Sequence, residues 1–314
     1  MKGYCQTVPM PLHPQARSLL EAIEELDQPP LEELEPEDAR ENRAALVRPS
    51  LIEGVVMRDL DAGGVGARLY RPAMVPDGVP TGLLLWFHGG GWVLGSIDGH
   101  DDLCRSLALR SGSRVLSVEY RLAPEHPFPA GLTDAITSAR WAHEHAAELG
   151  ADPDRIALGG DSAGANLAAV VAQLAPVPLR YQVLVYPVTD ARRTTESYRE
   201  NGDGRFLTAA GMEWFVNHYL AGGQGSEGDP RVSPLLASEQ AVAASPPTLV
   251  ITAQFDPLRD EGVAYADRLA DVGVATSHVM FHGQIHGFVS MPEFLDDADT
   301  ARAVIAQALA TAFR

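Results

Sequence analysis

The chain has 314 residues and a formal net charge of −18, with 46% hydrophobic and 21% charged residues. This length suits one large α/β domain with its own core, and such acidity argues against nucleic acid or an anionic membrane as a partner. The N-terminus lacks a signal-peptide pattern and no stretch is long enough to span a membrane, so we expect a cytoplasmic protein without stable membrane insertion.

Residues 1–48 are predicted to be helical and to carry no strand. The first helix has apolar residues spaced for one helix face: Leu19, Leu20, Ile23 and Leu26. Pro29 and Pro30 end that helix, and a second, acidic helix follows from about Pro36 to Val47. We interpret residues 1–48 as one helical part of a cap, and residues 49–314 as the catalytic domain.

Strands then alternate with helices along the rest of the chain. The first two expected strands form an antiparallel hairpin at a sheet edge, and the others are short apolar runs: 54–60, 67–71, 83–87, 115–118, 155–159, 181–186, 248–253 and 274–281. This order predicts a mostly parallel, eight-stranded sheet flanked by helices. Residues from about 191 to 235 lack strand signals, and we interpret them as an insertion that supplies the second part of the cap.

The sequence Gly160-Asp161-Ser162-Ala163-Gly164 lies between an apolar run and a run of small, helix-forming residues. A serine between two glycines on a strand–turn–helix is typical of a nucleophile elbow, where the hydroxyl stands at a helix N-terminus. A G-x-S-x-G match is weak alone in a glycine-rich chain, so its meaning depends on the other motifs.

A second glycine-rich motif, His88-Gly89-Gly90-Gly91-Trp92, follows the expected strand 83–87. It lacks the Lys-Ser/Thr of a phosphate-binding P-loop and the spacing of a dinucleotide site. We interpret it as an oxyanion loop, whose glycines let backbone N–H groups point at a developing negative charge. His88 is expected to hold this loop by hydrogen bonding. In the proline-rich segment 120–130, Arg121 and Glu125 are expected to pair and brace the site.

An acid and a histidine complete the constellation in the chain order of serine hydrolases, each after an expected strand. Asp256 is our candidate acid, with Asp260 and Asp190 as rivals; His286 is our candidate base, with His282 as its rival. Such a triad needs neither a metal nor a cofactor. The two cysteines indicate no disulfide framework or metal cluster, and Cys104 is expected to be a small buried hydrophobe.

Taken together, these motifs resemble the hormone-sensitive-lipase-like esterases of the α/β-hydrolase fold. The resemblance rests on residues 88–92, 120–130, 160–164, 256–262 and 286–288, in the family's order. It implies a triad of Ser162, Asp256 and His286, with oxyanion donors at the amides of Gly90, Gly91 and Ala163. Ala165 departs from the family, which usually has glycine there.

The resemblance further implies cleavage of short- to medium-chain carboxylic esters, and a homodimer formed through the sheet edge. The same triad serves an amide, lactone or N-formyl hydrolase, and these alternatives stay open from the sequence. A non-catalytic binding protein of this fold is a further alternative, against which the presence of His286 argues. A true lipase would require a more extended apolar lid than residues 191–235 offer.

Overall fold

The computed structural model describes residues 11–314; Cys5 and the start of the predicted N-terminal cap lie outside this range. The chain folds around one eight-stranded sheet with the order β1-β2-β4-β3-β5-β6-β7-β8. Its strands are β1 (Val55–Asp61), β2 (Gly66–Pro72), β3 (Thr81–Phe87), β4 (Arg114–Glu119), β5 (Ala151–Asp161), β6 (Tyr181–Val185), β7 (Thr248–Phe255) and β8 (Thr276–Ile285). Strand β2 is antiparallel to both of its neighbours, and every other adjacent pair is parallel. The eight expected strands and the hairpin at the edge are therefore confirmed.

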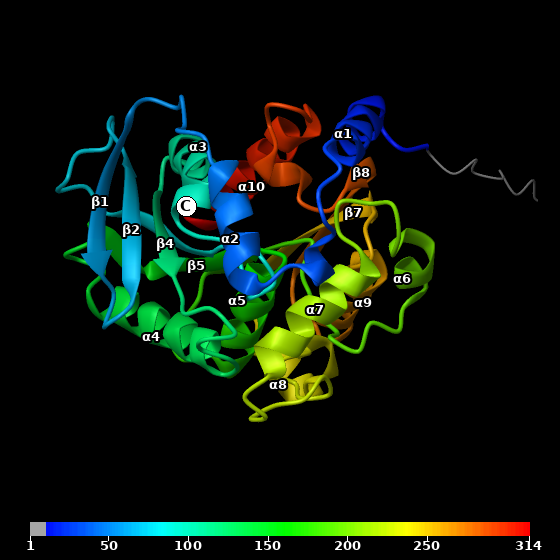
Figure 1. Ribbon diagram of the computed structural model, residues 1–314. Helices are drawn as coiled ribbons and strands as arrows, with labels where there is room; N and C mark the ends of the chain where they lie inside the picture. Colours follow the sequence, from blue (N-terminus) through cyan, green and yellow to red (C-terminus); the bar gives the residue numbers. More distant parts are fainter. Residues whose placement is uncertain (1–10) are drawn as a thin grey trace, which may run out of the picture.

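Helices cover both faces of this sheet, as Figure 1 shows. They are α1 (Pro14–Glu25), α2 (Pro36–Ala45), α3 (Asp101–Ser111), α4 (Ala130–Glu144), α5 (Ala163–Leu174), α6 (Glu196–Asn201), α7 (Ala209–Leu220), α8 (Glu239–Ala243), α9 (Arg259–Asp271) and α10 (Asp297–Ala312). Four short 3₁₀ turns complete the regular structure: η1 (Leu31–Glu33), η2 (Asp98–His100), η3 (Pro234–Leu236) and η4 (Phe288–Ser290).

The alternation of side chains along a strand divides the core into two layers. In β3, Leu83, Leu85 and Phe87 pack in the layer that contains α4, α5 and α9. Leu84 and Trp86 point to the opposite face and pack in the layer that contains α3 and α10. Because both faces of the strand are buried, its sequence is a continuous apolar run rather than an alternating one.

The N-terminal helices are less buried than their sequence pattern predicts. Leu19 and Leu20 pack against the core, but Ile23 and Leu26 are 39% and 62% exposed. Only part of the apolar face of α1 is therefore buried, because this helix contacts the sheet mainly beside β8. Cys104 is fully buried with a free thiol, as expected for a small hydrophobe.

Candidate active site

Ser162 lies at the turn between β5 and α5, in a backbone conformation that L-residues rarely adopt (φ 55°, ψ −117°). Its amide donates to the carbonyl of Val185 at 2.9 Å. The flanking glycines allow chain segments to touch: a Cβ on Gly164 would lie 1.9 Å from the Phe87 oxygen, and one on Gly160 would lie 2.4 Å from the Gly164 backbone. The local sequence therefore fixes the strained turn that presents the hydroxyl.

The imidazole of His286 lies between Ser162 and Asp256. Its Nε2 is 3.0 Å from Ser162 Oγ, and its Nδ1 is 2.8 Å from Asp256 Oδ2. All three side chains are buried, and the second oxygen of Asp256 accepts the Leu258 amide at 2.9 Å. The carboxylate therefore keeps a hydrogen on Nδ1, which leaves Nε2 free to accept the serine proton.

The rival residues have other partners. Asp260, in the first turn of α9, accepts the Ser197 amide at 2.8 Å and pairs with Arg259. Asp190 pairs with Arg192 at 2.7 Å, and the side chain of His282 is exposed. The structure thus brings Ser162, Asp256 and His286 together and leaves these three rivals outside their hydrogen-bond chain.

The glycine loop after β3 lies beside Ser162 and lines the same cavity. Gly90 and Gly91 have φ values of 117° and 60°, which favour glycine. A Cβ on Gly90 would lie 2.3 Å from the Leu94 oxygen. Within residues 11–314, no backbone or side-chain acceptor is recorded for the Gly90 and Gly91 amides, and Ala163 opens α5, where N–H groups have no partner in the helix.

His88 holds the glycine loop from inside the protein. Its Nδ1 donates to the Gly89 carbonyl at 2.9 Å, and its ring stacks on Tyr120 with centroids 4.3 Å apart. The Tyr120 hydroxyl donates to the His88 carbonyl at 2.7 Å. Burial, and then the neighbouring His100, lower the pKa of His88 to about 4. His88 therefore hydrogen-bonds within the loop, as the sequence predicted.

The expected pair of Arg121 with Glu125 is wrong. Arg121 binds Asp134 at 2.7 Å, while Glu125 binds Arg40 at 2.7 Å. The reason is that Arg121 precedes a turn that directs it toward α4, whereas Glu125 faces α2. The bidentate contact with Arg40 lowers the pKa of Glu125 to about 2. This segment therefore does brace the site, but through partners that lie elsewhere in the chain.

Two buried residues beside the elbow, Asp161 and His100, had no predicted role. His100 Nε2 lies 3.0 Å from Asp161 Oδ1, and the same carboxylate accepts the Gly89 amide at 3.1 Å. Burial acts to raise the pKa of Asp161, but His100 and the amide together hold that pKa below its usual value. The only sequence signal for this contact was Asp161 itself, a charged residue among the small residues of the serine motif.

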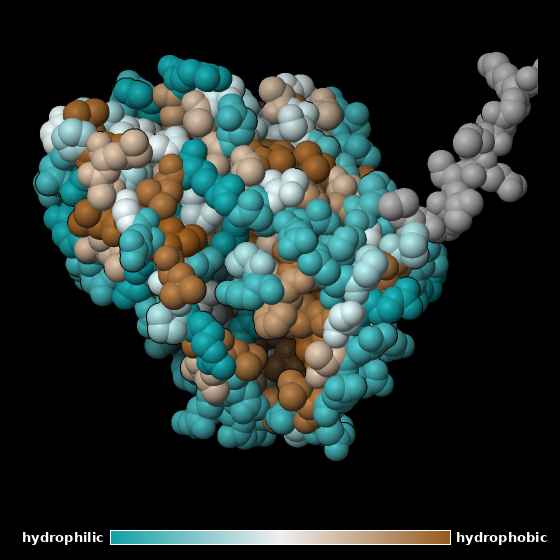
Figure 2. All heavy atoms as spheres, turned by 90° about the horizontal axis from the view of Figure 1, so that it is seen from above, coloured by the Kyte–Doolittle hydropathy of each residue, from teal (hydrophilic) through white to brown (hydrophobic). Residues whose placement is uncertain are grey.

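A cavity of about 500 Å³ opens above Ser162. Residues of α2, η1 and the segment 206–215 form most of its apolar wall: Leu31, Leu34, Ala39, Leu207, Met212 and Phe215. Figure 2 shows a hollow bordered by apolar residues on the surface of the molecule. No group of three or more potential metal ligands is found within residues 11–314, nor is any helix there long and apolar enough to cross a membrane.

Comparison with known proteins identifies the family. The model of a family described as having the alpha/beta hydrolase fold matches residues 84–290, about two thirds of the chain. The chain belongs to this family. Its branch is the hormone-sensitive-lipase-like one, and its class is that of a carboxylic ester hydrolase.

Relatives and solved structures agree with this assignment. The carboxylic ester hydrolase LipN of Mycobacterium tuberculosis is 46% identical over 239 residues, which cover 73% of this chain and 62% of LipN. An ethyl acetate hydrolase of Pseudomonas putida is 39% identical over 293 residues, covering 89% of this chain and 91% of the relative. A thermostable esterase from Pseudomonas putida ECU1011 superposes with a TM-score of 0.89 at 36% identity, covering 98% of this chain and 99% of that one.

Proposed function

We propose that this esterase hydrolyses short- to medium-chain carboxylic esters, with Ser162 as nucleophile, His286 as base and Asp256 as the acid that orients it. The observation that carries the proposal is the continuous hydrogen-bond chain of 2.8 Å and 3.0 Å that ends at a serine facing an apolar cavity. Nucleophile, base and orienting acid within hydrogen-bond reach are the signature of covalent acyl transfer.

The reaction follows from this geometry. His286 Nε2 takes the Ser162 proton as Oγ attacks the ester carbonyl, and Asp256 stabilises the imidazolium that forms. The amides of Gly90, Gly91 and Ala163 donate to the carbonyl oxygen as it becomes negative. His286 then protonates the departing alcohol. Water, deprotonated by the same imidazole, attacks the acyl-enzyme and releases the acid and the free serine.

The cap would set the length of the acyl chain. We assign residues 1–48 and 191–235 to it, because α2, η1 and α7 supply apolar side chains that face the cavity above Ser162. Figure 1 shows α2 and α7 on the same side of the sheet. An apolar pocket of about 500 Å³ has room for a short or medium acyl group. A relative of nearly equal length is named for a short ester, ethyl acetate, which supports a preference for short acyl groups.

The test is hydrolysis of p-nitrophenyl esters, from acetate to palmitate, by the wild type and by Ser162→Ala. We expect the wild type to be most active on short to medium chains and the variant to lose activity on the order of 10⁴-fold or more. A wild type inactive on all of these esters, or an equally active variant, would refute the proposal.

We also propose a homodimer and a cytoplasmic location. Strand β8 is an edge strand, and an apolar groove beside it is lined by residues of α10, β8 and the ends of β6 and β7. An edge strand of this kind, which His13 contacts only near its C-terminal end, is suited to pairing with a second copy along the rest of its length. Light scattering after size-exclusion chromatography tests the dimer, and fractionation of the source cells tests the location.

A further inference from the structure

Asp161 contacts two residues to which the reaction above gives no role, Gly89 and His100. Its carboxylate accepts the Gly89 amide at 3.1 Å, and His100 Nε2 lies 3.0 Å from Oδ1 and 3.2 Å from Oδ2. The three residues come from the loop after β3, the end of β5 and the turn η2. All of these polar contacts are buried. The carboxylate of Asp161, the residue directly before the proposed nucleophile, therefore links the glycine loop and the turn η2.

The hydrogen on His100 that faces Asp161 can be assigned. A carboxylate that lies within 3.2 Å of Nε2 through both oxygens requires a donor there, so Nε2 carries a hydrogen. His100 Nδ1 is buried and has no hydrogen-bond partner among the described residues. The Gly89 amide also lies 3.4 Å from Nε2, but an Nε2 that carries a hydrogen cannot accept from it, and the same amide is 3.1 Å from Asp161 Oδ1. The hydrogen-bond partner of the His100 ring is therefore the Asp161 carboxylate.

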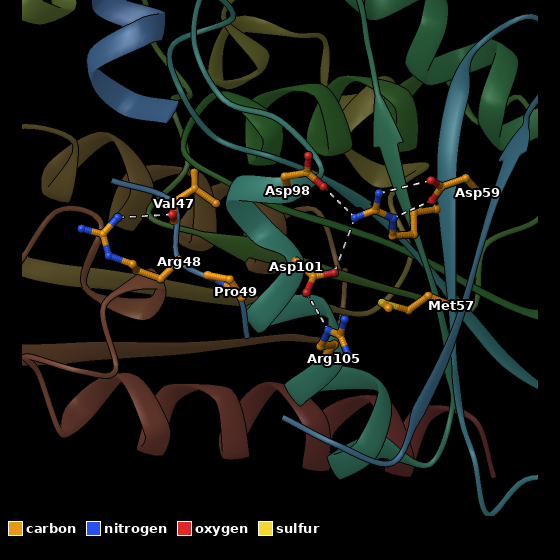
Figure 3. Close-up of a pocket in the computed structure, with 9 residues that line it drawn as sticks. Val47, Arg48, Pro49, Met57, Asp59, Asp98, Asp101 and Arg105 are labelled. Atoms are coloured by element: carbon orange, nitrogen blue, oxygen red, sulfur yellow. Dashed lines mark hydrogen bonds and ion pairs between the residues drawn. The ribbon is translucent and has the colours of Figure 1, made fainter. Parts of the chain in front are cut away.

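The turn that carries His100 is itself anchored on both sides. Arg68 of β2 binds Asp98 at 2.7 Å before His100, and Tyr70 donates to Asp101 at 3.0 Å after it. Arg105 pairs with Asp101 at 2.6 Å. Figure 3 shows Asp98 and Asp101 on either end of this turn, with Asp59 on the neighbouring strand. The ring of His100 is thus held by the sheet and does not depend on the cap.

The contact of Asp161 with Gly89 has a direct effect on the next two residues. A Cβ on Gly89 would lie 2.4 Å from Asp161 Oδ2, so loop and carboxylate are already in van der Waals contact. Gly90 and Gly91, the proposed oxyanion donors, follow immediately, and their amides have no hydrogen-bond acceptor among residues 11–314. Without the hydrogen bond from His100, the buried Asp161 carboxylate would need another donor. The Gly90 and Gly91 amides, which lie on the same loop, could supply it.

We propose that His100 is a positioning residue for the oxyanion loop. By holding the Asp161 carboxylate on the Gly89 amide, it keeps the Gly90 and Gly91 amides aimed at the oxyanion and free of a competing negative charge. This inference rests on the proposed esterase function. Because the oxygen becomes negative only in the transition state and the tetrahedral intermediate, His100 affects the rate of the chemical step and leaves substrate binding unchanged.

The experiment compares three substitutions on p-nitrophenyl butyrate. His100→Leu removes the donor, His100→Gln retains an N–H near the position of Nε2, and His100→Asn retains one near the position of Nδ1. We expect His100→Leu and His100→Asn to lower kcat on the order of 10²-fold with KM within about twofold. His100→Gln should recover kcat to within about fivefold of the wild type. The matched control His282→Leu alters an exposed histidine and should change neither value.

A second measurement separates positioning from a general loss of structure. A trifluoromethyl ketone forms a tetrahedral, negatively charged adduct with the serine, so its affinity should fall by the same factor as kcat in His100→Leu and His100→Asn. Equal kcat for His100→Gln and His100→Asn, or a change in KM alone, would overturn the inference while the wild type stays active. If His100→Leu does not fold, the comparison of His100→Gln with His100→Asn still tests the inference. An inactive wild type refutes the proposed function, and the inference with it.

Discussion

The floor of the pocket and helix α2 above it are held in different ways. The floor is fixed by short backbone contacts, such as the one that would put a Gly164 Cβ 1.9 Å from Phe87, and by a buried hydrogen-bond chain. Helix α2 buries only Pro36 and Ala39, and the leucine at its C-terminal end, Leu46, is 65% exposed. We infer that substitutions in the floor lower the activity on every ester. Substitutions in α2 should instead change the preference among esters of different acyl length.

The largest expected effect is in the floor, from Asp256→Asn. The amide can no longer hold the required hydrogen on His286 Nδ1, so kcat should fall on the order of 10⁴-fold. The loss should be the same for acetate and for octanoate esters, because the defect lies in the proton transfer. Steady-state kinetics on both esters measure it. Asp260→Asn is the matched control, and a larger loss there than in Asp256→Asn would contradict our choice of acid.

A second floor prediction concerns stability and pH. His88 has a folded pKa of about 4 and, when unfolded, one of about 6.5. The unfolded chain therefore binds a proton that the folded protein does not, and stability is lost as the pH falls from about 6.5 toward 4. Between pH 8 and pH 5 this loss amounts to about 2 kcal/mol.

Urea unfolding of the wild type and His88→Asn at these two pH values measures that loss. Asparagine can still donate to the Gly89 carbonyl, but it does not titrate. The variant should therefore lose about 2 kcal/mol less than the wild type between pH 8 and pH 5. His126→Asn, at an exposed position, should keep the pH dependence of the wild type. An unchanged pH dependence in His88→Asn would show that another group is responsible.

A smaller effect is expected where α2 is attached. Arg40 forms a bidentate contact with Glu125 and donates to the carbonyls of Val93 and Ala123. Arg40→Met should cost about 1 kcal/mol, because the ion pair is partly exposed and the helix keeps its apolar contacts. With α2 less restrained, we expect activity to shift toward longer acyl chains. Thermal unfolding and the p-nitrophenyl ester series measure the two effects, with Glu41→Gln, at an exposed position of the same helix, as the control.

The smallest effect is expected at Leu46, which lines the mouth of the cavity. Leu46→Trp should lower kcat/KM for octanoate about threefold relative to acetate, because the larger ring narrows the exit for a long chain. Activity on acetate should stay within about twofold. Equal loss on both esters would mean that α2 acts on the floor, and the distinction between the two regions would then be wrong.

The sequence predicted the sheet well because each strand carries its own signal. Strand β3 is a continuous apolar run, and the serine motif, the acid and the histidine follow strands in the expected order. The three side chains proposed as a triad do lie in contact. Their catalytic roles stay predictions until the substitutions are made.

Pairings between distant side chains could not be predicted in the same way. Arg40 and Glu125 are 85 residues apart, and His100 and Asp161 are 61 residues apart. The local sequence pattern shows only that a charged residue is present. Arg121, the partner nearer to Glu125 in the sequence, was therefore the wrong prediction. Which of many charges meet depends on how α2 and η2 lie against the sheet, and that placement is decided by packing.

The position of His286 in the chain has a consequence for how the protein is made. Ser162 precedes His286 by 124 residues, and β8, which leads to the histidine, joins the sheet at its edge beside β7. A ribosome adds residues in order, so the proposed nucleophile emerges long before its proposed base. If Ser162 and His286 act as proposed, the growing chain has no activated serine until its last strand is in place, and esterase activity begins only when the sheet is complete.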